Sequence, residues 1–336
     1  MMAAQSEYAD QFNGTALTPA ARPSNLLVLD RMPGLGSLYA KAIVPDPKAA
    51  LTRLTHKLPG NAQPTVNALE FALENVSYQV SGIRADLAHL ESYQQLVGEP
   101  VDEFLPAGFV HVLAFPAAMA IMVRPGFPLP VAGMIHLSNR VLMARPIHYT
   151  EELEVFAWAQ NQAGHPKGTS VDLVVEVRSQ GVPVWRGEST YLAKGKYLKG
   201  RGEQVERTEF HAPVPTAQWQ LTPRTAKQYA AISGDRNPIH TSLLGAKAFG
   251  FAKPIAHGMY TAARALAEAR PLRPERFIWT VEFGRPVLLP GKVSLALTAA
   301  PAPVTHTTVD NRSGALYTAW NAKTGKLFFS GQVASL

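Results

Sequence analysis

The sequence predicts an α+β fold built from two copies of one unit. In each copy a short helix precedes a longer apolar helix, and a run of antiparallel strands follows. The strands are indicated by apolar and polar residues that alternate with period two, as in TSVDLVVEVRSQG. The copies also share a fragment, since ARPIHYTEELEV (144–155) aligns with GRPVLLPGKVSL (284–295) after a one-residue gap. We therefore expect a duplicated unit in place of one large domain.

The first unit is expected over residues 61–200, behind a partly helical N-terminal extension of residues 1–60. Within the extension, Leu35–His56 has helical spacing that is interrupted at PDP. The unit itself contains a predicted helix over Gly82–Leu96 and an apolar helix over Phe109–Val123. The apolar stretch is about 15 residues long, against roughly 20 for a membrane span, so it is typical of a buried helix.

The second unit is expected over residues 201–336. Its first helix begins after the N-cap Thr222 and ends at Gly234, because a hydroxyl residue followed by proline starts helices and glycine ends them. Its apolar helix runs over His257–Ala269 and is stopped by Pro271. Four stretches of strand-like alternation follow this helix.

The composition fits a folded protein and excludes some kinds of chemistry. Hydrophobic residues make up 46% of the 336 residues and charged residues 17%, which is enough apolar material for two cores. The sequence contains no cysteine, so disulfides, thiolate zinc sites and cysteine nucleophiles are excluded. The first residues show no basic segment followed by an apolar one, so we expect a cytoplasmic protein with no secretory signal and no membrane span.

The net charge is +7, which suits anionic partners. The basic residues are scattered except in the segment AKGKYLKGR, which lies in a charged, Gly- and Pro-rich tract over Lys194–Pro215 that we interpret as a linker. No long basic arm is present, so nucleic acid is not an expected partner. The dense basic group consists of Lys194, Lys196, Lys199 and Arg201.

The segment SGDRNPIH groups Asp235, Asn237 and His240 within one bend. The turn residues Gly234 and Pro238 allow the carboxylate and the imidazole to face one pocket, which a continuous helix would do less well. A carboxylate beside an imidazole is suited to proton transfer. The alternative is a solvated loop in which Asp235 and Asn237 only cap the next helix, which is a common use of these residues.

The segment PIAHGM places Gly258 in the first turn of the second apolar helix. Amides in a first turn lack partners within the helix, and glycine lets a ligand come close. The alternative is a small residue needed only for packing. An alignment of the apolar helices puts Phe115-Pro116-Ala117 opposite His257-Gly258-Met259, and proline has no N–H to donate. This alignment predicts one working site and one copy that has lost it.

Other motifs are weak. His257 and His240 are 17 residues apart with no carboxylate at ligand spacing, so we expect no metal and a structural or substrate-shaping role for His257. The glycines of PGLGSLYAKA (33–42) follow too short a strand for a dinucleotide site. A G-x-S-x-G elbow is absent from the sequence, so serine hydrolysis of that type is not supported.

SGDRNPIH and PIAHGM together resemble the MaoC-like family of (R)-specific enoyl-thioester hydratases and (3R)-hydroxyacyl-thioester dehydratases. The first segment matches the signature [S/G]-G-D-x-N-P-[LIV]-H, and the second follows at the family's spacing. The segment FGRPVLLPG resembles the family's strand after the central helix, and the two-unit layout resembles its double-hotdog bacterial members. The resemblance is strong over 221–295, weaker over 107–194 and absent from the first 60 or so residues.

The resemblance implies a double hotdog fold, in which two long helices are each wrapped by a curved antiparallel sheet and the units pack as a pseudo-dimer. It implies reversible addition of water to a trans-2-enoyl thioester carried on CoA or acyl carrier protein, with no cofactor. The second unit is then the catalytic one. A further homodimer, a hotdog thioesterase and a non-catalytic acyl-thioester-binding protein remain alternatives to be separated by experiment.

The resemblance also assigns roles to the residues of the two segments. Asp235 and His240 become the catalytic pair, Asn237 orients them or the water, and the Gly258 N–H polarises the thioester carbonyl. The basic excess would meet the phosphates of CoA or an acidic carrier protein. The residues expected to bind substrate are Pro238, Ile255, His257 and Met259.

Overall fold

The computed structural model describes residues 12–13, 16–43, 72–204, 209–300 and 314–336. The boundary expected at residue 60 and the second part of the helix expected over Leu35–His56 lie outside these ranges. The N-terminal elements are β1 (Phe12–Asn13), β2 (Ala16–Leu17), β3 (Asn25–Leu29) and α2 (Leu35–Ile43).

The first half has the expected order of helix, longer apolar helix and strands, preceded by one strand. The expected helix over Gly82–Leu96 begins five residues later than predicted because the preceding residues pair in β4, and Asp86 then provides the N-cap. The elements are β4 (Val76–Ile83), α4 (Leu87–Val97), α5 (Ala107–Met122), β5 (Ile135–Met143), β6 (Leu153–His165), β7 (Gly168–Ser179) and β8 (Val182–Lys194).

The second half repeats this order. Thr222 caps its first helix and Gly234 ends it in a left-handed conformation, as predicted. The expected linker over Lys194–Pro215 connects the halves. The elements are β9 (Ala217–Leu221), α6 (Pro223–Ser233), α7 (Pro238–Thr241), α8 (Leu243–Ala248), α9 (Gly258–Glu268), η3 (Arg270–Leu272), β10 (Phe277–Phe283), β11 (Gly291–Ala299), β12 (Ala315–Asn321) and β13 (Leu327–Ser335).

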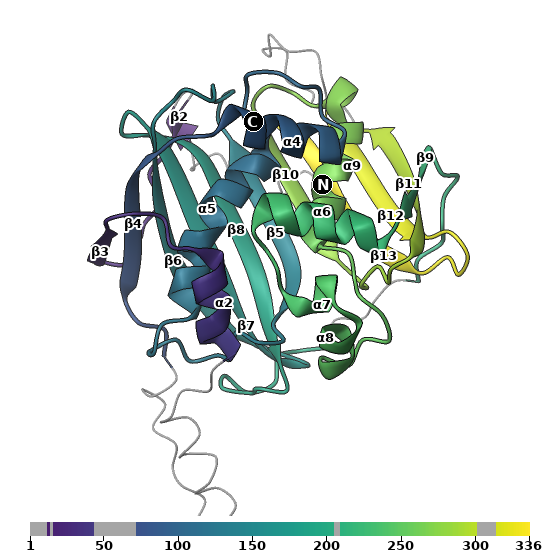
Figure 1. The fold of residues 1–336 in the computed structure, drawn as a ribbon, viewed down its shortest axis with the longest axis horizontal. Coiled ribbons are helices and arrows are strands. Elements are labelled where there is room, and N and C mark those ends of the chain that lie inside the picture. Colours follow the sequence, from purple (N-terminus) through teal and green to yellow (C-terminus); the bar gives the residue numbers. More distant parts are fainter. Residues whose placement is uncertain (1–11, 14–15, 44–71, 205–208, 301–313) are drawn as a thin grey trace, which may run out of the picture.

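The two halves share one sheet of 11 strands, in the order β3-β4-β6-β7-β8-β5-β10-β13-β12-β11-β9 (Figure 1). The antiparallel pair β5–β10 joins them, with Phe277 opposite Met143 at one end and Glu282 opposite Ser138 at the other. Outward from this junction the strands follow matching orders, β5-β8-β7-β6-β4 on one side and β10-β13-β12-β11-β9 on the other. The protein therefore has the α+β double hotdog fold, with β3 added in parallel to β4.

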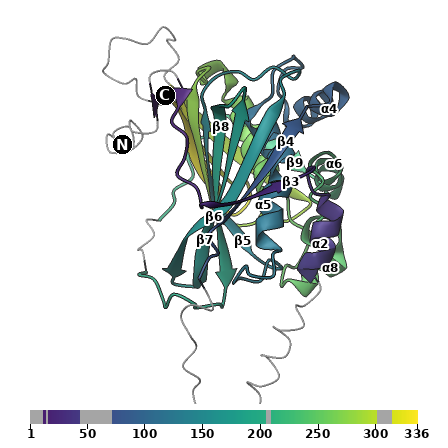
Figure 2. The same cartoon turned by 90° about the vertical axis from the view of Figure 1, so that its left-hand side faces the viewer.

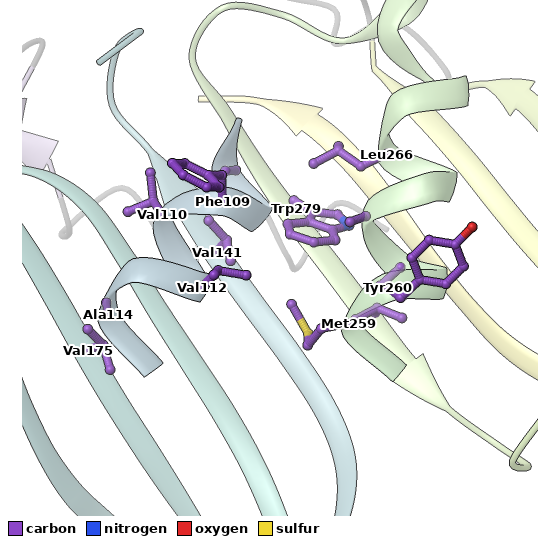
Figure 3. Packing of buried hydrophobic residues seen from close by; sticks show 14 of the residues in the cluster. Phe109, Val110, Val112, Ala114, Val141, Val175, Met259, Tyr260, Leu266 and Trp279 are labelled. Carbon is purple, nitrogen blue, oxygen red and sulfur yellow. The ribbon is translucent and has the colours of Figure 1, made fainter. Parts of the chain in front are cut away.

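Helices α2, α4, α6 and α8 lie on one side of the sheet (Figure 2). The central helices α5 and α9 belong to one continuous apolar core that spans both halves. Figure 3 shows Trp279 of β10 between the side chains of α5, such as Val112, and those of α9, such as Leu266. Within the described ranges, no helix is long and apolar enough to cross a membrane.

The alignment of Pro116 with Gly258 is wrong. The isolated bridges Phe104–His148 and Ile255–Leu288 occupy equivalent places in the two halves, just before α5 and α9. They make Ala107, the first residue of α5, the counterpart of Gly258, the first residue of α9. Pro116 instead lies inside α5, where it removes one backbone hydrogen bond. The first half has thus kept its first-turn amide and differs from the second in lacking the D-x-N-P-x-H residues.

Candidate active site

The loop between α6 and α7 brings a carboxylate and two imidazoles together. Ligand atoms of Asp235, His240 and His257 all lie within 4.8 Å of one another. Gly234 ends α6 with φ at 73°, which turns the chain so that Asp235 leaves the helix toward α9. Pro238 then starts the short helix α7, whose third residue is His240. The bend predicted from the sequence therefore joins Asp235 and His240.

His240 is held in one tautomer. Its Nδ1 lies 2.9 Å from the main-chain oxygen of Ile255, so Nδ1 carries the proton and donates it. Burial lowers the pKa of His240 below its ordinary value, against the opposing effect of Asp235. The imidazole is therefore neutral at pH 7, and among the described residues its Nε2 lone pair has no hydrogen-bond partner.

The Asp235 carboxylate has one oxygen occupied by the protein. Its Oδ1 accepts hydrogen bonds from the hydroxyl of Tyr39 and from the main-chain N–H of Asn237, the latter at 3.2 Å. Burial raises the pKa of Asp235, but the imidazoles of His257 and His240 and these hydrogen bonds outweigh it and hold the pKa below its ordinary value. Asp235 is thus ionised at pH 7, with Oδ2 available to a substrate.

His257 braces the other two groups. Its Nε2 donates to the main-chain oxygen of Asp235 at 3.0 Å, and its ring stacks on that of His240 with centroids 3.7 Å apart. The side chain is only 3% exposed. These contacts support the structural role expected for His257, because they fix both the Asp235 loop and the plane of the His240 ring.

Asn237 acts mainly through the backbone and as a helix cap. Its Oδ1 accepts from the N–H of Ile239 at 3.3 Å and so caps α7. Its own N–H, not its side chain, contacts the carboxylate of Asp235. The Asn237 side chain is therefore a helix cap, which was the alternative considered from the sequence. The main-chain N–H of Asn237 orients Asp235.

Gly258 begins α9 beside these residues, with His257 as its N-cap. Within the part of the chain that the structure describes, no acceptor is paired with the Gly258 N–H. A Cβ placed on Gly258 would lie 3.0 Å from the ring of Phe283 on β10, so a larger residue requires Phe283 to move. Glycine here combines a free amide with a close contact to the sheet.

The other residues predicted to bind substrate have clear structural contacts. Ile255 supplies the carbonyl that fixes His240, and its own N–H donates to Ile239. Met259 is buried in the core next to α5 (Figure 3). Pro238 starts α7 and packs against Gly245. Whether these side chains also touch substrate stays a prediction.

A cavity lies in the first half, between α5 and strands β7 and β8. Most of its wall is apolar, including Ala118, Val175 and Trp185, while His111 and Tyr191 add polar groups. Burial lowers the pKa of His111 to about 4 and raises that of Tyr191, and the charge of Asp235 acts on both groups in the upward direction. The cavity is lined by first-half residues, of which His111 and Tyr191 are the two that interact electrostatically with Asp235.

Three functional candidates were missed by sequence reasoning, namely Tyr39, His111 and Tyr191. None of them lies near the D-x-N-P-x-H segment in the sequence, and only the fold brings them to Asp235. His111 does fall in the apolar stretch that the sequence marked as a buried helix, where a histidine is unusual. That was the one available signal.

The cluster of Asp235, His240 and His257 has the donor atoms that a metal ion needs. However, Nδ1 of His240 and Nε2 of His257 are both bound to main-chain oxygens. One free imidazole nitrogen on each ring and one carboxylate oxygen remain. Proton transfer with a substrate requires only two of these free atoms, one on Asp235 and one on His240.

Comparisons with known proteins agree with this geometry. The MaoC like domain model matches residues 205–309, which include the candidate site. The 3-hydroxyacyl-thioester dehydratase X of Mycobacterium tuberculosis is 34% identical over 224 residues, which is 66% of this chain and 80% of that protein. The crystal structure of HtdX from the same organism has a TM-score of 0.66 and 30% identity, covering 77% of this chain and all 100% of that one.

A MaoC-like dehydratase from Phytophthora capsici has the same fold, with a TM-score of 0.57 at 19% identity and coverage of 81% of this chain and 99% of that chain. The mycobacterial dehydratase is 34% identical to this chain and 80% of its length is covered, which shows family membership in addition to a shared fold. The chain belongs to the MaoC-like dehydratase family.

Proposed function

We propose that this protein is a hydro-lyase that interconverts (3R)-3-hydroxyacyl thioesters and trans-2-enoyl thioesters in fatty-acid metabolism. The observation that carries this proposal is the grouping of an ionised Asp235 and a neutral His240 beside the free amide of Gly258. The family membership supports the same reaction, because the mycobacterial relative is a 3-hydroxyacyl-thioester dehydratase.

The reaction needs proton transfer at two neighbouring carbons. In dehydration the C2–H bond breaks, its electron pair forms the C2–C3 double bond, and the C3–O bond breaks. The departing oxygen takes up a proton, so that water leaves and no net proton is gained or lost. We assign both transfers to Asp235 Oδ2 and His240 Nε2. Because both atoms accept protons in the resting site, the proton that one of them takes from C2 is the proton that the pair then passes to the departing oxygen. General acid–base groups of this kind typically contribute about 10²–10⁴-fold.

The negative charge that develops on the thioester oxygen needs a donor. We assign this role to the Gly258 N–H, which lies at the N-terminus of α9 where the helix dipole also favours negative charge. A single donor to a developing oxyanion is worth roughly 10²–10³-fold. A Cβ at this position would lie 3.0 Å from the ring of Phe283, so glycine allows the amide to lie this close to β10.

In this proposal the acyl chain enters the first half by widening a small cavity there, whose volume without substrate is about 10 Å³. The wall of the cavity includes His111, which interacts with the charge of Asp235, and Ala114 and Ala118 on either side of Pro116. Small side chains around a proline leave more open space than a regular, well-packed helix. We therefore propose that acyl chains longer than four carbons enter this cavity.

The carrier is CoA or acyl carrier protein. Lys194 at the end of β8 and Lys196 and Lys199 after it are exposed, so they can meet the phosphates of either carrier. Activity measured on the same acyl chain attached to each carrier, at low and at 0.5 M salt, would identify the preferred one. A phosphate contact predicts a loss of affinity at high salt.

One assay separates the candidate functions. Purified protein is mixed with crotonyl-CoA, and the enoyl absorbance and the free thiol are followed together. Hydration lowers the absorbance without releasing thiol. Release of thiol would instead indicate a thioesterase, and a change in neither signal, together with measurable binding, would indicate a non-catalytic acyl-thioester-binding protein.

A further inference from the structure

Helix α2 brings a residue of the N-terminal extension to the candidate active site. It lies beside α5 (Figure 1) and precedes the first hotdog unit in the chain. The match to the MaoC like domain starts only at residue 205, so α2 is outside it.

One face of α2 is docked and the other is exposed. Leu35, Leu38 and Tyr39 are spaced three and four residues apart, which places them on one side of the helix. Leu35 and Leu38 are buried in the main core. The residues of the opposite side are exposed, namely Gly36, Ser37, Ala40 and Lys41. This amphipathic pattern fixes which side chain of α2 turns toward the site.

The docked face meets the catalytic loop at two successive residues. Leu35 packs on Gly234, where an added Cβ would lie 2.9 Å from Leu35 Cδ1. Four residues later, the hydroxyl of Tyr39 donates to Oδ1 of Asp235. The two contacts together seat α2 on the end of α6, so the hydrogen bond is part of a docked interface and not an isolated contact of a mobile side chain.

We propose that Tyr39 is a positioning residue, whose hydroxyl fixes the Asp235 carboxylate with Oδ1 bound and Oδ2 free for proton transfer. The inference rests on the proposed function of Asp235 and adds to it a residue from outside the hotdog units. Burial and the charge of Asp235 both raise the pKa of Tyr39, so its hydroxyl keeps the proton that it donates.

The hydrogen bond also stabilises the charged form of Asp235. Together with the N–H of Asn237 it favours the carboxylate over the neutral acid. Loss of the Tyr39 hydroxyl therefore raises the pKa of Asp235 and frees the carboxyl group to rotate. The other titratable groups that face Asp235 are His111 on α5, His136 on β5, Tyr191 on β8, Tyr229 on α6, and His240 and His257.

The test is Tyr39→Phe, which removes the hydroxyl and keeps the ring that packs against the core. Protein labelled with ¹³C at the aspartate carboxyl carbon is titrated by NMR down to the lowest pH at which it stays folded, and Asp235→Asn assigns the resonance. We expect protonation of Asp235 to begin about one pH unit higher in Tyr39→Phe than in the wild type. We also expect kcat on crotonyl-CoA at pH 7 to fall about tenfold, with KM little changed.

Tyr93→Phe is the matched control. Tyr93 is buried in the core, and its hydroxyl has no hydrogen-bond partner among the described residues. This variant loses the same atom away from Asp235, so the Asp235 resonance and kcat should equal those of the wild type. Ser37→Ala, on the exposed side of α2, should behave in the same way.

An unchanged Asp235 titration in Tyr39→Phe would overturn the proposal, as would an unchanged kcat. The NMR measurement does not depend on turnover. If the wild type failed to hydrate any enoyl thioester, the proposed function would fall, while a shifted Asp235 titration would still establish the contact. If Tyr39→Phe lowered the thermal stability, Leu35→Ala would distinguish undocking of α2 from loss of the hydroxyl. Leu35→Ala weakens the docking of α2 but retains the Tyr39 hydroxyl, so it should shift the Asp235 titration less than Tyr39→Phe does.

Discussion

The Nδ1 atom of His240 lies 2.9 Å from the main-chain oxygen of Ile255, which comes three residues before Gly258, the first residue of α9. This hydrogen bond ties the imidazole on α7 to the strand-like segment that leads into the central helix. It fixes both the ring orientation and the tautomer, so the free Nε2 faces the side of the ring away from that segment. The segments SGDRNPIH and PIAHGM are thus linked by a hydrogen bond, in addition to the roles proposed for both in one reaction.

Removing either member of the pair should stop turnover. Asp235→Asn leaves a group that cannot accept a proton at Oδ2, and His240→Ala removes the free Nε2. We expect kcat on crotonyl-CoA to fall by about 10²–10⁴-fold in each variant. Circular dichroism and thermal unfolding should remain close to the wild type, and near-wild-type rates in either variant would refute the site assignment.

Buried histidines should make the folded protein sensitive to acid. Burial, together with the neighbouring His111, lowers the pKa of His136 to about 3, and burial lowers that of His111 to about 4. Unfolded histidine titrates near its ordinary value of about 6.5. Between these values the unfolded chain binds more protons than the folded one, so stability is lost as the pH falls from about 6.5 toward 3.

His136→Phe should weaken this dependence. The His136 ring stacks on Tyr191 with centroids 4.5 Å apart, and a phenyl ring can keep this contact. The slope of the unfolding free energy against pH between about 6 and 4 should decrease by about 1.4 kcal/mol per pH unit. Urea unfolding at several pH values measures the slope. The exposed His211→Phe is the control, and an equal decrease in both variants would contradict the prediction.

The elements that the sequence predicted correctly are those whose signals are local. The cap Thr222 and the stop Gly234 act within one helix, and the D-x-N-P-x-H bend places Asp235 and His240 within six consecutive residues. Such signals depend little on the rest of the chain. The ends of α6 and the proximity of Asp235 and His240 were therefore predictable before the fold was known.

The rest depended on contacts between distant residues. Tyr39 and Asp235 are 196 positions apart, and no pattern around Tyr39 marks it as more than a residue of an amphipathic helix. The misplacement of Pro116 has a related cause. Helix α5 is apolar on nearly every side, so its sequence has no pattern that favours one alignment with α9 over another. Only the bridges before the two helices fix the correct alignment.

The free amide of Gly258 can be tested with a matched pair of variants. Gly258→Pro removes the N–H at the first residue of α9, where proline is well tolerated in helices. Gly258→Ala keeps the N–H but adds a Cβ that meets Phe283. We expect kcat to fall roughly 10²–10³-fold in Gly258→Pro and less than about tenfold in Gly258→Ala. Equal losses in the two variants would mean that crowding against Phe283, and not the donor, matters.

The cavity of the first half can be filled from α5. Ala118 lines it, and Ala118→Phe would occupy the space that we assign to the acyl chain. We expect kcat/KM for a twelve-carbon enoyl-CoA to fall more than about tenfold, because its chain is excluded, while the value for crotonyl-CoA changes less than about threefold.

The ratio of the activities on the twelve-carbon and four-carbon substrates, measured in the same variant, separates exclusion of the chain from general effects of the substitution. Overpacking costs about 1–3 kcal/mol of stability and would lower both activities together, whereas exclusion of the chain lowers only the longer one. Ala231→Phe, on the exposed side of α6, adds the same side chain away from the cavity and should leave the ratio of the two activities unchanged. An unchanged ratio in Ala118→Phe, or a wild type no more active on twelve carbons than on four, would place the acyl chain elsewhere.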